Sequence, residues 1–425
     1  MMIRTALVVL ALALTPGATM AAGYSLYEQG GRALGFSGAF TARADDASAV
    51  FFNPAGLAHI KEGEIYLGTS FIFVSREFAG EAPFPGFGVT EKSPNQVFFP
   101  STFYWAHPIS ETVGLGFGFY SPFGLATEWE DPEQFSGRFI STRAEITPFY
   151  FNPALAVELS PQIRVGGGLM AVHSSVELRR HIAQPNPTDV GPDILDLGNV
   201  QLEGSNNLDF GFNVGLQVDL TDKIVMGATY RSGITVPFEG EADFTFLGSG
   251  TALDPQLQPL FPEDQDVSTE LPFPAMFIAA LGVDITEKLA VEADFGWTQW
   301  SDFGSLPLDF EDTSLSSTVE QNWEDAFFIR TGAEIELNPT TDLRLGYYYD
   351  ETPQILESAS PLLADNDRHG LSAGLGYTSG NWRADFFGMV LLISDRSTDG
   401  VNRDGYEGTY ASGTQILGAS FGYRY

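Results

Sequence analysis

From Glu64 onward, apolar and polar residues alternate with a period of two along most of the chain. Between Leu208 and Asp219, one face carries only Leu, Phe and Val, and the other carries Asp, Gly, Asn and Gln. The pattern returns in Leu289–Trp297 and in Phe327–Leu337. A period of two is the signature of a β-strand with two different faces. The alternation therefore predicts an all-β fold for residues 63–425.

Alternation alone does not say whether the apolar face meets lipid or a protein core, because a soluble sandwich shows the same pattern. The lengths of the connections distinguish the two cases. Short links rich in turn residues alternate with long irregular links, which is the plan of an outer-membrane barrel, here a transmembrane antiparallel β-barrel of about 14 strands. The short links are Pro108–Glu111, Ser160–Pro161, Asp219–Lys223, Asp284–Lys288, Asn338–Thr341 and Thr378–Asn381, and the long ones lie near residues 80–95, 121–137, 180–200, 240–268, 303–321, 350–366 and 394–411.

Residues 1–21 have the features of a secretory signal peptide. Arg4 supplies a positive start, Ala6–Leu14 an apolar core, and Thr19–Ala21 a small-residue cleavage site. The apolar core is too short to span a bilayer, and no run of about 18 apolar residues follows it. We therefore expect an exported protein without membrane-spanning helices.

The composition excludes several classes of function. The chain has no cysteine, which excludes a disulfide scaffold and every thiolate metal site. Its 55 acidic and 21 basic residues give a formal net charge of −34, and this sign excludes nucleic acid as a partner. The acidic residues gather between strands, where they form a solvated surface or bind divalent cations beside lipopolysaccharide. The five histidines have neither metal-ligand spacing nor a neighbouring nucleophile elbow, so we expect no catalysis and no cofactor.

Residues 22–62 lack the alternation and are dense in Gly, Ala and Ser. Such a segment has too little apolar area to offset its ordering entropy, so it needs a container. We therefore expect it to be a hatch (plug) inside the lumen of the barrel. Asp45 and Asp46 are candidate caps of its one predicted helix, Ala47–Phe52. Asn53–Ala55, with Pro54 at its centre, is expected to end that helix in a rigid turn.

Aromatic residues gather at the ends of the predicted strands, as in the interfacial girdles of membrane barrels. For any single residue, the alternative is burial in a core. The girdle candidates are Tyr104, Trp105, Phe149–Phe151, Trp297, Trp300, Tyr347–Tyr349, Trp382, Tyr423 and Tyr425.

A collinear series of short motifs resembles the FadL/TodX family of outer-membrane transporters for long-chain fatty acids and other hydrophobic compounds. The series covers essentially the whole mature chain. The resemblance implies a barrel of about fourteen strands closed by an N-terminal hatch, with a hydrophobic site among the extracellular loops and a deeper pocket against the hatch. It also implies a sideways exit into the membrane where the third strand kinks. The motifs are Ala22–Tyr24, Ala44–Ala47, Asn53–Ala55, Phe123–Glu128, Tyr230–Ser232, Leu271–Pro272, Trp297–Ser301, Asp325–Ala326 and Asp367–Arg368.

The kink has a local basis in the third predicted strand. Gly114, Gly116 and Gly118 leave one face of that strand without side chains, and Ser121 and Pro122 follow it. Because proline withdraws a donor from the ladder, such a strand can bend inward and leave a lateral opening beside it. The simpler alternative is that the strand ends there.

Four residues are candidates for contact with ligand. The resemblance assigns Tyr24 to the inner pocket and Arg180 to the carboxylate of a fatty acid; the alternative for Arg180 is a salt bridge at the rim. An unpaired carboxylate in an apolar pocket would be costly. A second basic residue expected before the tenth strand is absent, because Val319–Glu320 stands there, which leaves room for a neutral alkane or aromatic hydrocarbon. Phe84 and Phe87 are expected to capture ligand at the entrance or to pack within their own loop.

These features predict passive transport across the outer membrane of a Gram-negative bacterium. Ligand would adsorb to apolar loops, reach a pocket against the hatch and leave through the wall. The expected partners are hydrophobic small molecules, outer-membrane lipid, lipopolysaccharide, and the barrel-assembly machinery through the C-terminal strand. The chain is expected to be a monomer. The alternatives are hydrocarbon uptake, a general porin, a structural or adhesive barrel, and a lipid-cleaving enzyme.

Overall fold

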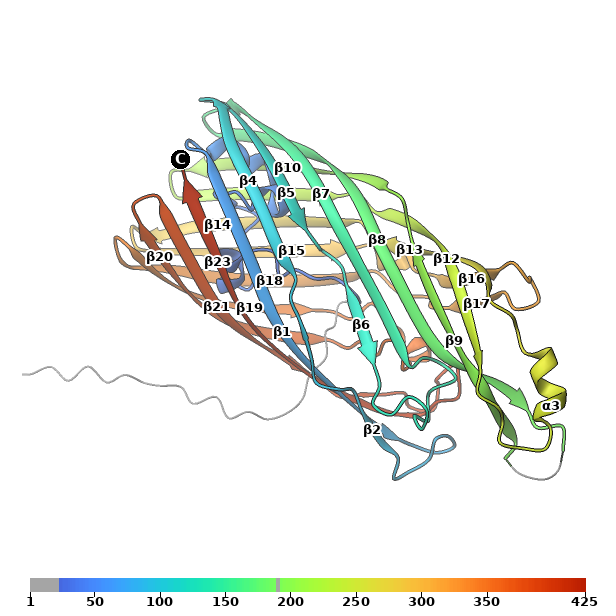
Figure 1. Ribbon diagram of the computed structural model, residues 1–425. Coiled ribbons are helices and arrows are strands. Elements are labelled where there is room, and N and C mark those ends of the chain that lie inside the picture. The colour runs from blue at the N-terminus through green and yellow to red at the C-terminus, as the bar shows by residue number, and fades with distance from the viewer. Residues whose placement is uncertain (1–22, 189–191) are drawn as a thin grey trace, which may run out of the picture.

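The computed structural model describes residues 23–188 and 192–425, so the expected signal peptide lies outside the described residues. Within them the chain forms one closed antiparallel sheet of fourteen wall strands (Figure 1). The sheet closes where β1 (Glu64–Gly80) pairs with β23 (Gly408–Arg424) along its full length. The prediction of an all-β barrel of about fourteen strands is confirmed.

Several wall strands are interrupted, so the fourteen consist of 23 strand segments, and a few short helices lie in the links. The remaining elements of the wall and its links are β2 (Thr90–Lys92), β3 (Gln96–Phe98), β4 (Ser101–Ser110), β5 (Val113–Tyr120), β6 (Leu125–Glu128), β7 (Arg143–Ser160), β8 (Ile163–Pro185), β9 (Ile194–Ser205), β10 (Asp209–Thr221), β11 (Ile224–Arg231), β12 (Ile234–Phe246), α3 (Asp254–Leu257), η2 (Gln258–Leu260), β13 (Gln265–Phe273), β14 (Met276–Thr286), β15 (Leu289–Thr298), η3 (Trp300–Asp302), β16 (Ser305–Phe310), β17 (Ser317–Glu320), β18 (Ala326–Asn338), β19 (Thr341–Asp350), η4 (Leu356–Ser358), β20 (Arg368–Ser379), β21 (Trp382–Ile393) and β22 (Arg396–Ser397).

The two rims of the barrel differ as the link lengths predict. Tight turns, such as those between β7 and β8 and between β20 and β21, lie at the rim that holds the C-terminus (Figure 1). The long links, including the one that carries α3, lie at the opposite rim. In an outer-membrane barrel the short turns are periplasmic and the long loops are extracellular, which orients the molecule.

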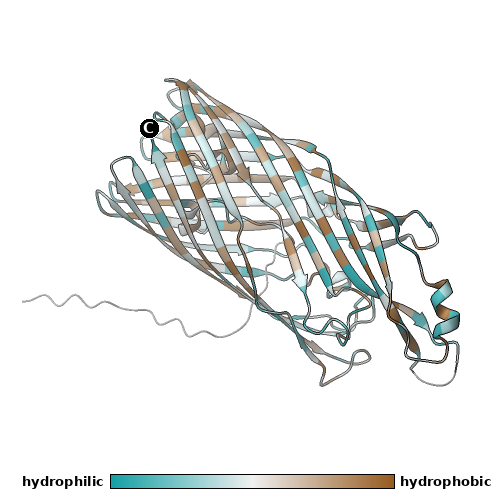
Figure 2. Cartoon of the chain, in the orientation of Figure 1, coloured by the Kyte–Doolittle hydropathy of each residue, from teal (hydrophilic) through white to brown (hydrophobic). Residues whose placement is uncertain are grey.

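The apolar face of the wall points outward. On β10, Phe210 is 71% exposed, whereas Asn213 and Gln217, which point to the opposite face of the strand, are buried in the lumen. The same alternation of hydrophobic and hydrophilic positions runs along the wall strands in Figure 2. A soluble sandwich would bury the apolar face instead, so the alternation here is that of a wall in lipid.

The girdle prediction is wrong for four residues. Tyr104, Tyr150, Tyr348 and Trp300 are buried inside the barrel. Successive residues of a strand point to opposite faces, so the middle tyrosine of an aromatic run must face the lumen when its neighbours face lipid. The outward aromatic residues are Phe149, Phe151, Tyr347, Trp382, Tyr423 and Tyr425.

Residues 23–62, here called the hatch, lie within the barrel and are largely buried. They contain α1 (Gly31–Gly35), α2 (Ala49–Phe52) and the 3₁₀ helix η1 (Pro54–His59). The helix expected over Ala47–Phe52 begins later, at Ala49, and α1 was not predicted at all. A five-residue helix with glycine at both ends has no pattern to find, and α1 is held by the wall: Gly31 N–H donates to Ser420 Oγ (2.8 Å). Among the described residues, none of the helices is long and apolar enough to cross a membrane.

Charged side chains of the lumen brace the hatch against the wall. Arg32 of the hatch pairs with its neighbour Asp45 and with Glu334 of β18 (3.4 Å). Arg344, which is fully buried, joins the same Glu334 to Asp385 of β21, each at 2.7 Å. Breaking a buried network of this kind leaves uncompensated charges, which is strongly destabilising. The network therefore fixes the hatch at the periplasmic half of the lumen.

The glycines of β5 face the hatch. A Cβ on Gly114 would lie 2.0 Å from the carbonyl oxygen of Leu57, and one on Gly116 would lie 2.6 Å from Val50. The ladder at these positions is intact on both sides, with β4 and with β7. The structure thus differs from the expectation that the glycines line an opening: they allow the hatch to approach the wall closely.

We expect Gly114→Leu to displace the hatch while leaving the barrel closed, because the new side chain would overlap η1. Limited proteolysis in detergent measures the change, and cleavage within residues 23–62 should be about five times faster or more. Gly388→Leu, whose side chain would point toward lipid, is the matched control. Equal cleavage rates in the two variants would contradict the packing described here.

Candidate ligand-binding pockets and wall openings

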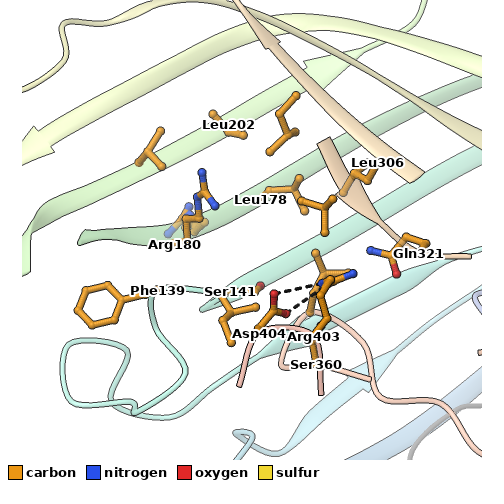
Figure 3. A pocket seen from close by; sticks show the side chains of 16 residues that line it. Phe139, Ser141, Leu178, Arg180, Leu202, Leu306, Gln321, Ser360, Arg403 and Asp404 are labelled. Carbon is orange, nitrogen blue, oxygen red and sulfur yellow. Dashed lines mark hydrogen bonds and ion pairs between the residues drawn. The ribbon is translucent and has the colours of Figure 1, made fainter. Parts of the chain in front are cut away.

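An outer pocket lies among the extracellular ends of the strands (Figure 3). Most of its lining residues are apolar, and the polar ones are Ser141, Arg179, Arg180, Gln321, Ser360, Arg403 and Asp404. Arg403 is paired with its neighbour Asp404 (2.9 Å). The apolar lining residues are Phe139, Ile140, Leu178, Val200, Leu202, Leu306, Leu308, Val319 and Leu362.

Arg180 is the cation that this pocket offers to a ligand. It is half-buried at the extracellular end of β8, and its guanidinium has no ion pair or hydrogen bond within residues 23–188 and 192–425. The neighbouring Arg179 points outward, is 45% exposed and pairs with Glu177 (2.5 Å). A half-buried cation without a partner in the protein can pair with an anion, so the pocket can accept a carboxylate.

A narrow inner pocket, with room for about one water molecule, continues from the outer one toward the hatch. The two pockets share Leu178, Leu306 and Gln321. Apart from Gln321 and Ser360, the walls of the inner pocket are apolar or aromatic: Tyr24, Leu125, Ile146, Val176, Leu178, Leu271, Phe303, Leu306, Trp323, Leu362 and Leu363. This composition suits a ligand without polar groups along most of its length.

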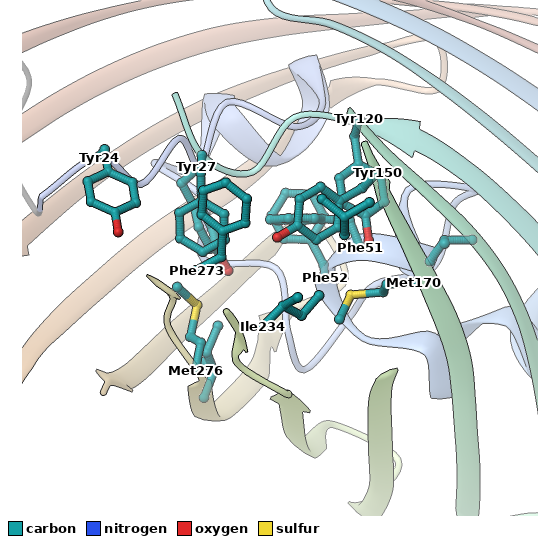
Figure 4. Packing of buried hydrophobic residues seen from close by; sticks show 14 of the residues in the cluster. Tyr24, Tyr27, Phe51, Phe52, Tyr120, Tyr150, Met170, Ile234, Phe273 and Met276 are labelled. Carbon is teal, nitrogen blue, oxygen red and sulfur yellow. The ribbon is translucent and has the colours of Figure 1, made fainter. Parts of the chain in front are cut away.

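Tyr24 fills an aromatic cage beside this inner pocket. Its ring packs edge-on against Trp300, with 4.7 Å between ring centroids. The rings of Phe303 (5.9 Å) and Trp323 (6.0 Å) lie somewhat farther away. Its hydroxyl donates to the carbonyl oxygen of Pro272 on β13. Figure 4 shows the ring near Phe273, at the edge of a continuous cluster of buried aromatic residues. Space for a ligand here grows if this ring moves.

The wall is interrupted at residues 121–124, between β5 and β6. The ladder between β4 and β5 ends at Phe103 and Phe119, and β6 pairs only with β7 among the described residues. The hatch supplies the missing bonds: Leu26 N–H donates to Pro122 O, and Gly124 N–H to Tyr24 O, both at 2.8 Å. Ser121 and Pro122 thus meet the N-terminal end of the hatch.

Asp365, which the sequence reasoning missed, also holds that end of the hatch. Gly23 N–H (3.0 Å) and Thr352 Oγ1 (2.5 Å) donate to its carboxylate. Burial raises the pKa of Asp365 to about 6, although both hydrogen bonds act in the opposite direction. No spacing or motif in the sequence indicates that Asp365 binds the hatch. It lies in a long link after Leu362–Ala364, and in the sequence it cannot be distinguished from a solvated loop carboxylate.

The other site residues expected from the sequence lie elsewhere. Phe84 and Phe87 are exposed in the loop after β1, and neither lines either pocket. Asp45 and Asp46 belong to the base of the hatch, where Asp46 Oδ1 accepts from Ser48 N–H (3.0 Å). In the part of the chain that the structure describes, no cluster of His, Asp or Glu is arranged to hold a metal ion.

The turn at Asn53, Pro54 and Ala55 ties the hatch to the wall. Asn53 Oδ1 accepts from Ala55 N–H (3.2 Å), which caps η1. Its amide donates to Leu216 O of β10 (3.0 Å). None of these three residues lines either ligand pocket, so the turn anchors the base of the hatch to the wall.

We expect Tyr24→Ala to tighten the binding of a small apolar probe such as benzene about fivefold or more, because removing the ring opens a dry apolar space. Fluorescence of the nearby Trp300 and Trp323 reports the binding. Tyr423→Ala, on the lipid face, is the control. Identical dissociation constants for Tyr24→Ala and the parent would show that Tyr24 does not limit access.

Comparison with known proteins gives one family. Residues 12–425 match the family model for outer membrane protein transport proteins, OMPP1/FadL/TodX. The chain is 27% identical to the 47 kDa outer membrane protein of Pasteurella multocida, over 98% of this chain and 97% of the relative. It is 24% identical to a long-chain fatty acid transport protein of Escherichia coli, over 86% of each chain.

Solved structures of the same architecture are similar to this one. A FadL homologue of Pseudomonas aeruginosa superposes with a TM-score of 0.84 at 18% identity, covering 95% of this chain and 99% of its own. The toluene transporter TodX of P. putida superposes with a TM-score of 0.73 at 16% identity, covering 94% and 99%. At these identities the likeness concerns the fold.

Proposed function

The chain belongs to the OMPP1/FadL/TodX family of outer membrane transport proteins, and from this premise we propose that it admits long-chain fatty acids by passive diffusion. As a member of the family it is an outer-membrane transporter of hydrophobic compounds in a Gram-negative bacterium. The family consists of transport channels, and the proposed passage leaves the ligand chemically unchanged.

The observation that supports this proposal most directly is the continuity of the two pockets. The outer pocket offers one unpaired guanidinium, Arg180, above apolar walls, and the inner pocket is apolar down to Tyr24. A fatty acid has the complementary shape, with one anionic end and a long apolar chain. Its carboxylate would pair with Arg180 while its chain descends toward the hatch.

In this mechanism, release follows from movement of the N-terminal end of the hatch. A chain that reaches the aromatic cage competes with the ring of Tyr24 for space. When Tyr24 leaves, its carbonyl no longer accepts from Gly124, and the interruption at residues 121–124 loses its cover. The ligand then passes sideways into the membrane through that lateral opening, while Asn53 and the ion network retain the base of the hatch.

The exposed Phe84 and Phe87 would act first, as an apolar surface that collects ligand from lipopolysaccharide or from solution. We also propose that the barrel-assembly machinery recognises the C-terminal strand β23. The barrel would work as a monomer, since its sheet is closed without a partner.

Uptake of neutral aromatic or aliphatic hydrocarbons is the second candidate. The family includes TodX, and one of the similar structures is a toluene transporter. In this chain Val319 lines the outer pocket and Glu320 follows it, so the pocket has no second base there. A single cation gives less preference for anions than a pair would.

We expect Arg180→Met to weaken binding of palmitate about tenfold, because a charge-assisted hydrogen bond is worth about 1.5–3 kcal/mol. Binding of hexadecanol, which has the same chain without the charge, should be unchanged. Isothermal titration of the detergent-purified protein measures both.

Arg179→Met is the matched control: Arg179 also borders the pocket, but its side chain is exposed and already paired with Glu177, so the substitution removes an equal charge without removing an unpaired one. It should leave both affinities as they are. Equal palmitate affinity in Arg180→Met and the parent would remove the fatty-acid assignment and favour a neutral ligand. Absence of binding of either ligand by the parent would contradict the transport proposal itself.

A further inference from the structure

A second interruption of the wall lies between the sixth and seventh wall strands. Below it, β10 pairs with β11 as far as Asn213 and Arg231; above it, β9 pairs with β12 from Ser205 and Glu239. The two ladders are in the same register, because the sum of paired residue numbers is 444 in each. Within the described residues, no backbone hydrogen bond joins residues 206–211 to residues 233–238. We call this stretch the second gap.

The cause is a mismatch of faces. On the sixth wall strand, which consists of β9 and β10, the exposed side chains belong to odd-numbered residues up to Ser205 and to even-numbered residues from Leu208 onward. On the seventh wall strand, which consists of β11 and β12, the exposed side chains change from even-numbered to odd-numbered residues at 232–233. In the register of the two ladders, this change does not lie opposite the change on the sixth strand. Between the two changes Phe210 points outward, whereas Ile234, which the register would place opposite it, points inward. Directly paired residues must share a face, so no ladder can form there.

The second gap also fits its surroundings chemically. Its outer side carries Leu208 (50% exposed) and Phe210 (71%), which lie at the extracellular end of β10. Beyond them, the outward residues of β9 are the polar Ser205 and Glu203. It therefore lies at the outer edge of the apolar band. Its inner side carries the buried side chains of Ile234, Val236 and Phe238. Pro237 removes one donor that a ladder would need.

The lumen behind the second gap leads to the ligand pockets. Ile234, Val236 and Phe238 belong to the same apolar cluster as Tyr24 and Phe273, and Figure 4 shows Ile234 within it. A small apolar cavity lined by Phe238 also includes Val176 and Leu178, which line the inner pocket. Only side chains, and no ladder, therefore separate the inner pocket from lipid at this point.

Unpaired backbone groups facing a membrane are costly, and barrels are closed for that reason. We infer that the second gap is a separate lateral passage, which connects the inner pocket with the outer leaflet for uncharged apolar molecules, with Ile234 and Phe238 as its gate. This inference rests on the proposed transport function and adds a route on the side of the barrel formed by β9 to β12.

The charge above the second gap defines the ligand class. A row of carboxylates crosses the outer face in register, with Glu145 opposite Glu177, Glu177 opposite Glu203, and Glu203 opposite Glu241. Arg143 pairs with Glu145 and Glu177, and Arg179 pairs with Glu177, whereas no ion pair within the described residues holds Glu203 or Glu241. An anionic headgroup beside Glu203 and Glu241 would therefore meet like charges, whereas an uncharged molecule would not. Fatty acid anions are accordingly assigned to the opening at residues 121–124.

A disulfide across the second gap tests the inference, and the natural absence of cysteine makes the test clean. A Cβ on Gly211 would lie 2.8 Å from Cγ1 of Ile234, so cysteines at both positions can reach bonding distance. Cells carrying Gly211→Cys/Ile234→Cys are compared in oxidised and reduced form. The probe is the uncharged fluorophore N-phenyl-1-naphthylamine, and the readout is its initial rate of uptake. We expect uptake to be at least five times slower when oxidised and to recover with dithiothreitol.

Val214→Cys/Tyr230→Cys, across the intact ladder just below, is the matched control and should be insensitive to oxidation. Should the first disulfide not form, Phe238→Trp fills the gate without a crosslink and is expected to slow uptake about threefold. Uptake that is equally fast in the oxidised variant, or in Phe238→Trp, overturns the second passage. If the parent takes up palmitate but takes up the neutral probe no faster than cells without the protein do, the second passage alone is overturned. If the parent takes up neither molecule faster than those cells do, the proposed function is overturned, and this inference with it.

Discussion

Closure of the backbone hydrogen-bond ladder is the constraint on which the rest of this molecule depends. A wall in lipid must pair its own N–H and C=O groups, and the full-length pairing of β1 with β23 completes that requirement. Where the ladder stops, at residues 121–124, backbone groups of Tyr24 and Leu26 take its place. Wall and hatch are therefore joined by hydrogen bonds at this point, and opening the wall at residues 121–124 requires moving the hatch.

The hatch is held unequally along its length. Its base is fixed by the buried ions Arg32, Glu334, Arg344 and Asp385, which are costly to separate. Its N-terminal end is held by a few neutral hydrogen bonds, by aromatic packing and by Asp365. Local opening begins where the fewest strong contacts must break, which is this end. A ligand in the inner pocket therefore acts on the part of the hatch that yields at the lowest cost.

The period of two together with the alternation of short and long links was sufficient to predict the barrel, its strand number and its rims, because both are local properties of the sequence. The features that depend on pairing were not predictable in the same way. The changes of face at residues 206–208 and 232–233 become a gap only once the register between the two strands is known. From the sequence alone, Gly114 indicates a weak point of the wall. The structure shows instead that it leaves room for the backbone of Leu57 in the hatch. Asp365 and α1 depend on distant residues, so no local pattern marks them.

Hydrogen exchange at two amides tests the central claim that ligand displaces the N-terminal end of the hatch from the wall. Leu26 N–H and Gly124 N–H are the donors of the two bonds that cover residues 121–124. Saturating palmitate should speed exchange at both amides about tenfold or more, while the Gly31 amide, bonded to Ser420 beside the ion network, stays protected. Unchanged exchange at Leu26 and Gly124, in protein shown to bind the ligand, would contradict the account.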